Sequence, residues 1–237
     1  MLVVKQNMAI MKRMELKMYN VFITGCDKNT EWMIPWWYEH IRKTGVPLVL
    51  YDFGMTESML EWAKLPKEID IPPRLNTGKA AWFNKPDAIK HAIGIFSKVV
   101  WVDTDCQVFP GAEDIFDKLV DNKLNMVVDR PWSARDGSTW YNSGVVGVTT
   151  YNMDILDKWI EICKPKYKHR GDQEALHHYL GNDPLSGLVN INELPNEYNW
   201  LRLQGEPASP VKIRHHTGPK GKALIKSMME YDRQSKA

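Results

Sequence analysis

Short apolar runs alternate with segments of helical pattern along most of the chain, and this alternation constrains the fold more than any other feature. The run 98–102 is almost continuously apolar, as in parallel strands that are buried on both faces of a sheet. Strands that alternate with helices at intervals of about 20 to 30 residues form βαβ units. The pattern predicts one α/β domain with a mainly parallel central sheet and helices on both faces.

The expected strands and helices follow one another in a regular order. Strands are expected at 20–24, 48–51, 98–102, 125–128, 144–148, 189–191 and 211–213. A first helix is expected up to about residue 44, capped by Asn29 or Thr30. Further helices are expected at 57–63, 79–96, 115–120, 153–163 and 172–180. A chain of 237 residues without internal repeats predicts a single domain.

Composition excludes several classes of protein. No apolar run approaches the roughly 20 residues of a transmembrane helix, and residues 1–18 lack the apolar core of a secretory signal. The three cysteines, Cys26, Cys106 and Cys163, have unrelated spacings that predict neither a disulfide framework nor a zinc site. A reducing cytoplasm is therefore the expected location.

The net charge of +2 is unevenly distributed. Residues 1–18 carry +3, residues 211–237 carry +5, and the body between them carries −6. A basic tail suits a phosphate, an anionic membrane or nucleic acid, although a solvated lysine-rich helix is the alternative after residue 222. Five methionines in residues 1–18 indicate a translation start near Met14 or Met18, or otherwise a short amphipathic helix packed on the body.

Two carboxylates, Asp103 and Asp105, follow the buried run 98–102 at the point where the strand ends. In an open parallel sheet, ligands bind outside the carboxyl ends of the strands. Paired carboxylate oxygens there suit a Mg²⁺ or Mn²⁺ ion that holds a diphosphate. A solvated turn in which Asp105 caps the following residues is the alternative.

The segment 211–222 crowds His215, Gly218, Lys220 and Lys222 into a few residues. A neutral imidazole can join carboxylates on a transition metal. Lysine ammonium groups, with backbone N–H groups freed by glycine, can hold phosphate oxygens. A basic surface turn is the alternative.

Two further polar segments precede it. Asn142 and Ser143 lead into a strand that is punctuated by glycines, and Asp172 and Gln173 begin a helix. Asp172 on its own is typical of a helix N-cap.

The order of these motifs resembles the GT-A glycosyltransferases, specifically the retaining group known as family eight, which includes bacterial galactosyltransferases and glycogenin. The resemblance runs from Tyr19 to about Lys222. Through TGCDKNTEW, YDFGM, DTDC, YNSGVVG, GDQEALHH and HHTGPKGK, the chain is also similar to glycosyltransferases of large tailed phages. The resemblance to family eight implies a single Rossmann-like GT-A domain at 19–222, an N-terminal extension at 1–18 and a basic helix or tail at 223–237.

The resemblance also implies an activity. A hexose would pass from a nucleotide sugar, UDP-glucose or UDP-galactose, to an acceptor hydroxyl with retention of configuration and with Mn²⁺ or Mg²⁺ as cofactor. The acceptor would be a glycan or another hydroxyl compound. The phage resemblance would also allow a modified nucleic acid as the acceptor, with the enzyme acting in the cytoplasm of the host.

Site residues follow from the same resemblance. Asp103, Asp105 and His215 would bind the metal, while Asp172, Gln173 and Asp129 would lie near the reacting sugar or the acceptor. The donor would be bound by Thr24, Gly25, Cys26, Lys85, Asp103, Thr104, Asp105, Asn142, Ser143, Gly218, Lys220 and Lys222. The sequence departs from the family at Gly221, which stands where the family has its phosphate-binding lysine, so the clamp is either Lys220 or Lys222.

Gln173 also bears on the mechanism. A retaining hydrolase uses a carboxylate nucleophile, but an amide is a poor nucleophile. A front-face substitution, in which the leaving phosphate assists the incoming hydroxyl, therefore fits better, and Asp172 is the weaker alternative as nucleophile.

Two tryptophans, Trp132 and Trp140, flank the polar segment 133–138, and either packing or stacking on an acceptor would explain them. Two other functions stay open. A non-catalytic nucleotide-sugar or glycan-binding module would need Asp103 but neither Gln173 nor His215. A sugar nucleotidyltransferase would carry more glycines after the first strand than residues 24–30 do.

Overall fold

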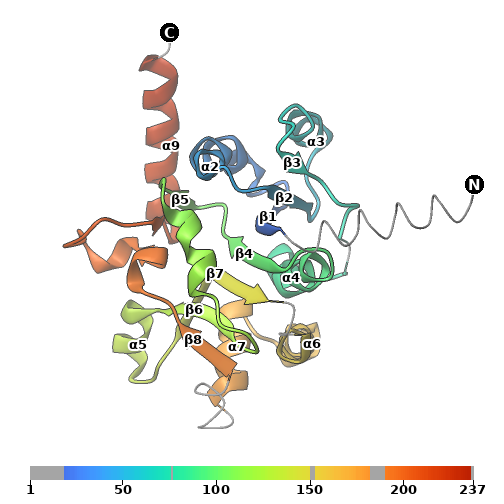
Figure 1. Cartoon of the computed structure of the whole chain (residues 1–237), viewed down its shortest axis with the longest axis vertical. Coiled ribbons are helices and arrows are strands. Elements are labelled where there is room, and N and C mark those ends of the chain that lie inside the picture. The colour runs from blue at the N-terminus through green and yellow to red at the C-terminus, as the bar shows by residue number, and fades with distance from the viewer. Residues whose placement is uncertain (1–18, 76, 150–152, 182–189, 236–237) are drawn as a thin grey trace, which may run out of the picture.

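The computed structural model of the chain describes residues 19–75, 77–149, 153–181 and 190–235. Its main sheet has seven strands in the order β3-β2-β1-β4-β7-β6-β8, and among them β7 alone runs antiparallel to its neighbours (Figure 1). The strands are β1 (Asn20–Cys26), β2 (Leu48–Asp52), β3 (Ile69–Asp70), β4 (Lys98–Val102), β6 (Leu124–Val128), β7 (Tyr141–Thr149) and β8 (Ile191–Glu193). The mainly parallel sheet predicted from the sequence is confirmed.

A second, three-stranded sheet lies at the side of the first. Its order is β5 (Cys106–Val108), β10 (Ile213–His215) and β9 (Trp200–Leu201). Strand β10 pairs antiparallel with β5, so that His215 lies opposite Cys106. This pairing brings the segment around His215 next to the residues that follow β4.

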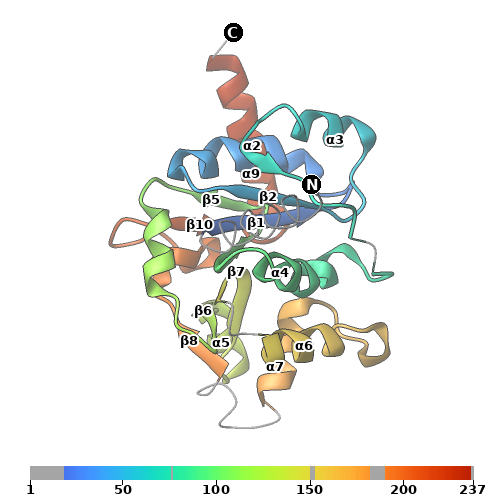
Figure 2. The same ribbon diagram turned by 45° about the vertical axis from the view of Figure 1, so that its right-hand side comes forward.

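Helices cover both faces of the main sheet, and alternate side chains of each strand decide which helices it meets. Val21 and Ile23 of β1 belong to a core with α4 (Lys85–Ile93), α6 (Met153–Ile162) and α7 (Asp172–Gly181). Phe22, between them, belongs to a core with α2 (Ile34–Ile41) and α9 (Gly218–Ser235). Figure 2 shows β1 and β2 between α2 above and α4 below.

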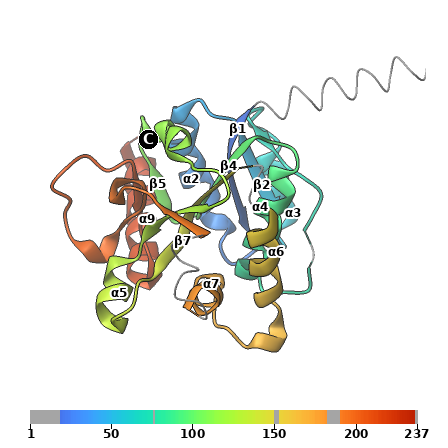
Figure 3. The ribbon, with the colours of Figure 1, turned by 60° about the horizontal axis from the view of Figure 1, so that its bottom comes forward.

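Two further short helices are α3 (Glu57–Ala63) and α5 (Arg130–Asp136), and Figure 3 shows α5 and α9 on one side of the fold and α6 on the other. Short 3₁₀ segments occur at Glu31–Met33, Arg42–Thr44, Ala81–Asn84, Ala112–Lys118, Pro165–Tyr167, Asn196–Asn199 and Arg202–Gln204. None of the helices in the described ranges has both the length and the apolar character that a bilayer span needs.

The start of β7 is redirected by a bulge. Met126 of β6 lies opposite Val146, but the next residue, Val127, lies opposite Asn142. Bulges re-aim side chains and are common beside functional sites. Here the shift places Asn142 to Gly144 beside the end of β4, where the N–H of Asp103 donates to the carbonyl of Gly144 at 2.8 Å.

Several sequence predictions were wrong in detail. The helix expected at 79–96 is only Lys85–Ile93, preceded by the 3₁₀ turn Ala81–Asn84, and the helix expected at 115–120 is the 3₁₀ turn Ala112–Lys118. Thr30 does not cap the first helix, because its hydroxyl instead contacts the carboxylate of Asp27 at 3.0 Å.

The polar segment 133–138 lies mostly in an unpredicted helix, α5, which Asp129 caps and Gly137 ends. Helix α9 starts at Gly218, so the predicted boundary between 222 and 223 falls within one continuous helix. Predictions for residues 1–18, 189 and 236–237 lie outside the described residues.

Candidate functional site

A cavity of about 340 Å³ opens where β1 and β4 end and β7 begins, as expected of an open α/β sheet. Residues from seven parts of the chain meet at it. Its lining includes Gly25, Cys26, Asp27, Asn29, Thr30, Phe53, Trp82, Lys85, Trp101, Asp103, Thr104, Asp105, Ser143, Asp172, Gln173 and Lys222.

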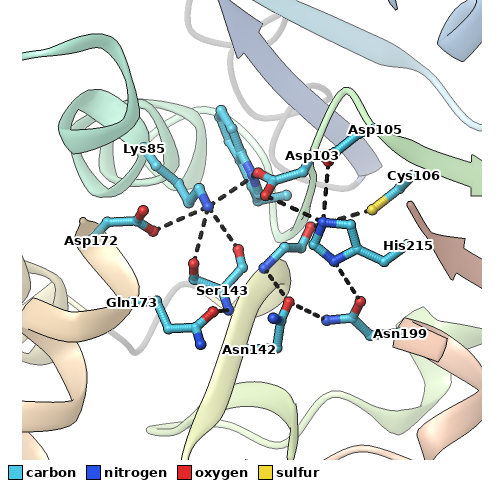
Figure 4. A network of polar contacts seen from close by, with 12 residues as sticks. Lys85, Asp103, Asp105, Cys106, Asn142, Ser143, Asp172, Gln173, Asn199 and His215 are labelled. Carbon is cyan, nitrogen blue, oxygen red and sulfur yellow. Dashed lines mark hydrogen bonds and ion pairs between the residues drawn. The ribbon is translucent and has the colours of Figure 1, made fainter. Parts of the chain in front are cut away.

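Lys85, the first residue of α4, lines the cavity, and its ammonium group contacts several side chains of the site (Figure 4). Its ammonium group is 3.1 Å from Asp103 Oδ1 and 3.0 Å from Asp172 Oδ2, and it donates to the carbonyl of Ser143 at 2.9 Å. Burial by itself disfavours the charged ammonium, but Asp103 and Asp172 outweigh it and raise the pKa of Lys85 above its ordinary value. Asp172 is therefore part of an ion-paired cluster, which a simple N-cap role would not require.

Asp105 and His215 form the second pair of the site. His215 Nε2 is 3.1 Å from Asp105 Oδ1 and 3.9 Å from Asp103 Oδ2. The other ring nitrogen, Nδ1, is 3.1 Å from the Oδ1 oxygen of Asn199. The side-chain NH₂ of Asn199 donates to Asn142, so its oxygen faces His215 and Nδ1 must carry the proton.

The position of this proton bears on whether Asp103, Asp105 and His215 can hold a metal ion. With the proton on Nδ1, a neutral His215 points the lone pair of Nε2 at a carboxylate, and that contact is favourable only with a cation between them. A proton on Nε2 is one solution, and Asp105 accordingly outweighs burial and raises the pKa of His215. A divalent ion held by Asp103, Asp105 and His215 is the other, and this oxygen-rich donor set suits Mn²⁺ or Mg²⁺.

Cys106 lies within reach of the same group of ligand atoms. Its thiol is fully buried in the core, and burial raises its pKa well above the ordinary value. Sulfur is a soft ligand, whereas Mn²⁺ and Mg²⁺ prefer oxygen ligands. The carboxylates and the imidazole therefore suit such an ion better than Cys106 does.

A second cavity of about 220 Å³ adjoins the first, and the two share Asp105 and Gln173 in their walls. The remaining wall is both polar and apolar. It consists of Asp129, Trp132, Asn142, Leu201, Leu203, His215, Thr217 and Gly218. Trp132 and Leu203 are 44% and 60% exposed, which leaves two large apolar side chains open to a ligand.

Gln173 is held at both ends of its amide. Its Nε2 donates to Asp129 Oδ2 at 3.0 Å, and its Oε1 accepts from the N–H of Ser143 at 3.2 Å. Asn142 donates to the same oxygen of Asp129 at 2.8 Å. Residues from β7, α7 and the cap of α5 are thereby joined in one network.

Known structures share this architecture at low sequence identity. The galactosyltransferase LgtC, in complex with donor and acceptor sugar analogues, superposes with a TM-score of 0.63 at 15% identity, covering 87% of this chain and 95% of that chain. GlyE, a glycosyltransferase of Streptococcus pneumoniae TIGR4, gives 0.68 at 15% identity, covering 90% of this chain and 60% of GlyE. The chain has the GT-A fold. No family profile matches the sequence, and no curated protein does either.

The predicted site residues fall into three groups according to the cavity that they line. One group lines the first cavity, namely Gly25, Cys26, Lys85, Asp103, Thr104, Asp105, Ser143, Asp172, Gln173 and Lys222. Asn142, Asp129, His215 and Gly218 line the second cavity instead. Thr24 and Lys220 line neither, since Thr24 is fully buried in β1 and Lys220 is exposed on α9.

The structure adds two details about the basic segment of this GT-A chain. Of the two candidate clamp residues, Lys222 lines the first cavity and Lys220 does not. Gly221 lies within α9, and a Cβ there would come within 2.0 Å of the His216 carbonyl oxygen. The glycine is required by close packing of the helix.

Sequence reasoning missed three residues of the GT-A site. Asn199 orients His215, Trp101 donates to Asp103 at 2.6 Å, and Gly144 leaves room for the imidazole of His215. Asn199 lies in a 3₁₀ turn without any motif, so no local signal was present. Gly144 belongs to the motif YNSGVVG, but the sequence does not indicate that it lies next to His215, 71 positions later.

Proposed function

We propose that the protein is a metal-dependent glycosyltransferase that moves a hexose from a nucleotide sugar, UDP-glucose or UDP-galactose, to an acceptor hydroxyl with retention of configuration. The observation that carries the proposal is the ion-paired cluster of Lys85, Asp103 and Asp172 beside the Asp105–His215 pair, at the place where two adjoining cavities of a GT-A fold meet. The structural likeness to LgtC, a galactosyltransferase bound to donor and acceptor sugar analogues, supports it.

Asp103, Asp105 and His215 would hold Mn²⁺ or Mg²⁺. When bound, such an ion neutralises the charge that develops on a departing diphosphate. Lys222, at the rim of the same cavity, adds a cation for the phosphate oxygens. Gly25 and Cys26, at the end of β1, would line the nucleotide pocket together with Asp27 and Asn29.

The transfer is a front-face substitution. The bond between the anomeric carbon and the phosphate oxygen breaks, and a bond to the acceptor oxygen forms on the same face. The acceptor proton passes to the departing phosphate oxygen. Gln173 borders both cavities, and its amide would contact the reacting sugar. An active-site glutamine-to-glutamate mutant of LgtC also has a solved structure, in keeping with a glutamine at this place.

The second cavity would take the acceptor. Trp132 and Leu203 offer apolar surface for a sugar ring, while Asn142 and Asp129 offer polar groups. A glycan or another hydroxyl compound fits this surface, and a modified nucleic acid stays an option because a tryptophan also stacks on a base. The site is consistent with an enzyme of the cytoplasm, where nucleotide sugars are made.

Release of nucleoside diphosphate from a panel of nucleotide sugars, with Mn²⁺ and with EDTA, tests the proposal. We expect turnover with one UDP-hexose, its loss in EDTA, and its loss in Asp105→Asn. NMR of the transferred product should show the anomeric configuration of the donor. Binding of nucleotide sugar without turnover would instead indicate a binding module, and release of pyrophosphate from a nucleoside triphosphate and a sugar phosphate would indicate a nucleotidyltransferase.

A further inference from the structure

The orientation of the Gln173 side-chain amide follows from its two partners. The backbone N–H of Ser143 can only donate, so the amide group facing it must be the oxygen. The carboxylate of Asp129 accepts from Trp132 N, Asn142 Nδ2 and Gln173 Nε2, so the group facing it must be the NH₂. A flipped amide would place donor against donor and acceptor against acceptor.

The same contacts relate the amide to the two cavities. Ser143 lines the first cavity and not the second, whereas Asp129 lines the second and not the first. Gln173 lines both. Its oxygen is therefore held at the end nearer the donor cavity, and its NH₂ at the end nearer the second cavity.

Asp129 itself has no freedom to turn toward a substrate. It is 2% exposed, its N–H donates to the carbonyl of Trp140 at 2.7 Å, and one carboxylate oxygen caps α5. The other oxygen accepts hydrogen bonds from the side-chain amides of Asn142 and Gln173. The oxygen of Asn142 in turn accepts from the N–H of Gly144 and from Asn199. This arrangement suits a residue that acts through its neighbour.

We infer that Asp129 is a positioning residue that fixes the Gln173 amide with its oxygen toward the donor sugar and its NH₂ toward the acceptor. The inference rests on the proposed glycosyl transfer. An amide oxygen carries partial negative charge and stabilises the positive charge that develops at the anomeric carbon, whereas an NH₂ group in its place opposes that charge. Asp129 thus controls the sign of the dipole that the reacting sugar meets.

Asp129→Ser separates this role from the role of Asp129 in folding. A serine at this position can still cap α5, but it is too short to accept from Gln173. We expect kcat to fall by at least tenfold while the Kd for the nucleotide sugar, measured by calorimetry, changes less than twofold. Thr56→Ala is the matched control, because it removes the N-cap of α3, lines neither cavity, and should leave kcat within twofold.

A reciprocal exchange tests the contact itself. Gln173→Glu places two carboxylates against each other. In Asp129→Asn/Gln173→Glu an amide again faces a carboxylate, and the NH₂ of Asn142, which then meets a second NH₂ group, gives up its bond to residue 129. Residues in direct contact couple non-additively, so the double variant should recover at least about tenfold of the kcat lost in Gln173→Glu. If the loss of kcat in the double variant equals the combined losses of the two single variants, the inference is overturned.

NMR of the ¹⁵N-labelled protein decides the question without turnover. The side-chain NH₂ resonances of Gln173, assigned by their absence in Gln173→Ala, should exchange slowly with solvent in the wild type and rapidly in Asp129→Ser. Slow exchange in both proteins would show that Asp129 does not hold the amide. A wild type that lacks turnover with every nucleotide sugar would overturn the proposed function, and the NMR result would still decide the role of Asp129.

Discussion

His215 Nε2 lies 3.1 Å from Oδ1 of Asp105, although 110 residues separate the two in sequence. The contact depends on the second sheet, in which β10 pairs with β5, and on a hydrogen bond from the N–H of His216 to the carbonyl of Asp105 at 2.9 Å. The metal-binding group predicted from two distant motifs is thus assembled by backbone pairing.

The neighbouring histidines should behave differently when removed. His215→Ala should lower Mn²⁺ affinity by at least the roughly 10- to 100-fold that second-shell changes cause, because it removes a ligand. His216 instead packs edge-on against Trp36 and contacts Gln107, so His216→Ala should lower the free energy of unfolding and leave Mn²⁺ affinity within about threefold. Calorimetric Mn²⁺ titration and urea unfolding of both variants check this, and equal metal affinities in the two would contradict it.

The two candidate clamp lysines also differ in position. Lys222 lines the first cavity, whereas Lys220 is exposed on the first turn of α9. Burial raises the pKa of Asp105, but His215 outweighs it and, with a smaller contribution from the charge of Lys222, holds that pKa below its ordinary value. A charge-assisted hydrogen bond to phosphate contributes about 1.5 to 3 kcal/mol. Lys222→Ala should therefore raise the donor KM by about 10- to 100-fold, and Lys220→Ala by less than about twofold. Steady-state kinetics decide it, and a larger effect of Lys220→Ala would reverse the assignment.

Stability in acid should depend on Asp52, at the end of β2. Burial raises the pKa of its carboxyl, but a hydrogen bond from Arg74 and those from the N–H groups of Gly54 and Met55 hold the pKa below its ordinary value. A depressed pKa stabilises the fold above the unfolded-state pKa of about 4, and this stability is lost as the pH falls through the lower folded-state value.

Arg74→Ala should consequently lower the free energy of unfolding at pH 7 and have progressively less effect below about pH 4. Urea unfolding at pH 7 and at pH 3 measures the difference. Arg42→Ala, which breaks a pair with Glu39 that is about half exposed on both sides, is the control and should change the free energy of unfolding less than Arg74→Ala does at pH 7. A loss of stability in Arg74→Ala that is larger at pH 3 than at pH 7 would have the wrong sign.

Sequence patterns predicted the parts of this fold that are locally encoded. Strands such as 98–102 are apolar throughout because both of their faces are covered, and the carboxylates after them mark the carboxyl edge of the sheet. These two signals were sufficient for the layer arrangement and for the position of Asp103 and Asp105.

The remaining parts depend on contacts that no local pattern encodes. Strands β5, β9 and β10 have only two or three residues each, too few for a period to be recognised, yet they place His215. Lys220 and Lys222 look alike in sequence, and only the start of α9 at Gly218 decides which one faces the cavity. The role of Asn199 depends on its hydrogen bonds with His215 and Asn142, which its neighbours in the chain do not indicate.

Lys85 should be important for stability as well as for the site. Its side chain is 5% exposed and it compensates two carboxylates, Asp103 and Asp172. Removing one partner of a buried ion pair typically costs about 3 to 5 kcal/mol, because the charges left behind are uncompensated. Lys85→Met should show this loss in urea unfolding. Lys79→Met, which leaves the single carboxylate of Asp87 uncompensated, should cost less, and a reversed order would contradict the central role of Lys85.

Gly144→Ala should disable the metal site without changing any ligand. A Cβ at this position would lie 2.2 Å from Cε1 and 2.5 Å from Nδ1 of His215, and 2.9 Å from Oδ1 of Asn142. The imidazole would have to move and would lose its contact with Asp105. We expect Mn²⁺ affinity to fall by at least about tenfold, as for the loss of a residue that orients a ligand.

Gly147→Ala, three residues further along β7, is the matched control for Gly144→Ala. Its added Cβ would meet Leu119 Cδ2 at 2.3 Å, at the end of a flexible side chain that can rearrange away from the metal site. Overpacking of this kind costs about 1 to 3 kcal/mol of stability. Mn²⁺ affinity should nevertheless stay within about threefold of the wild type. Calorimetric titration of both variants checks the pair, and an unchanged Mn²⁺ affinity in Gly144→Ala would mean that His215 does not bind the metal from this position.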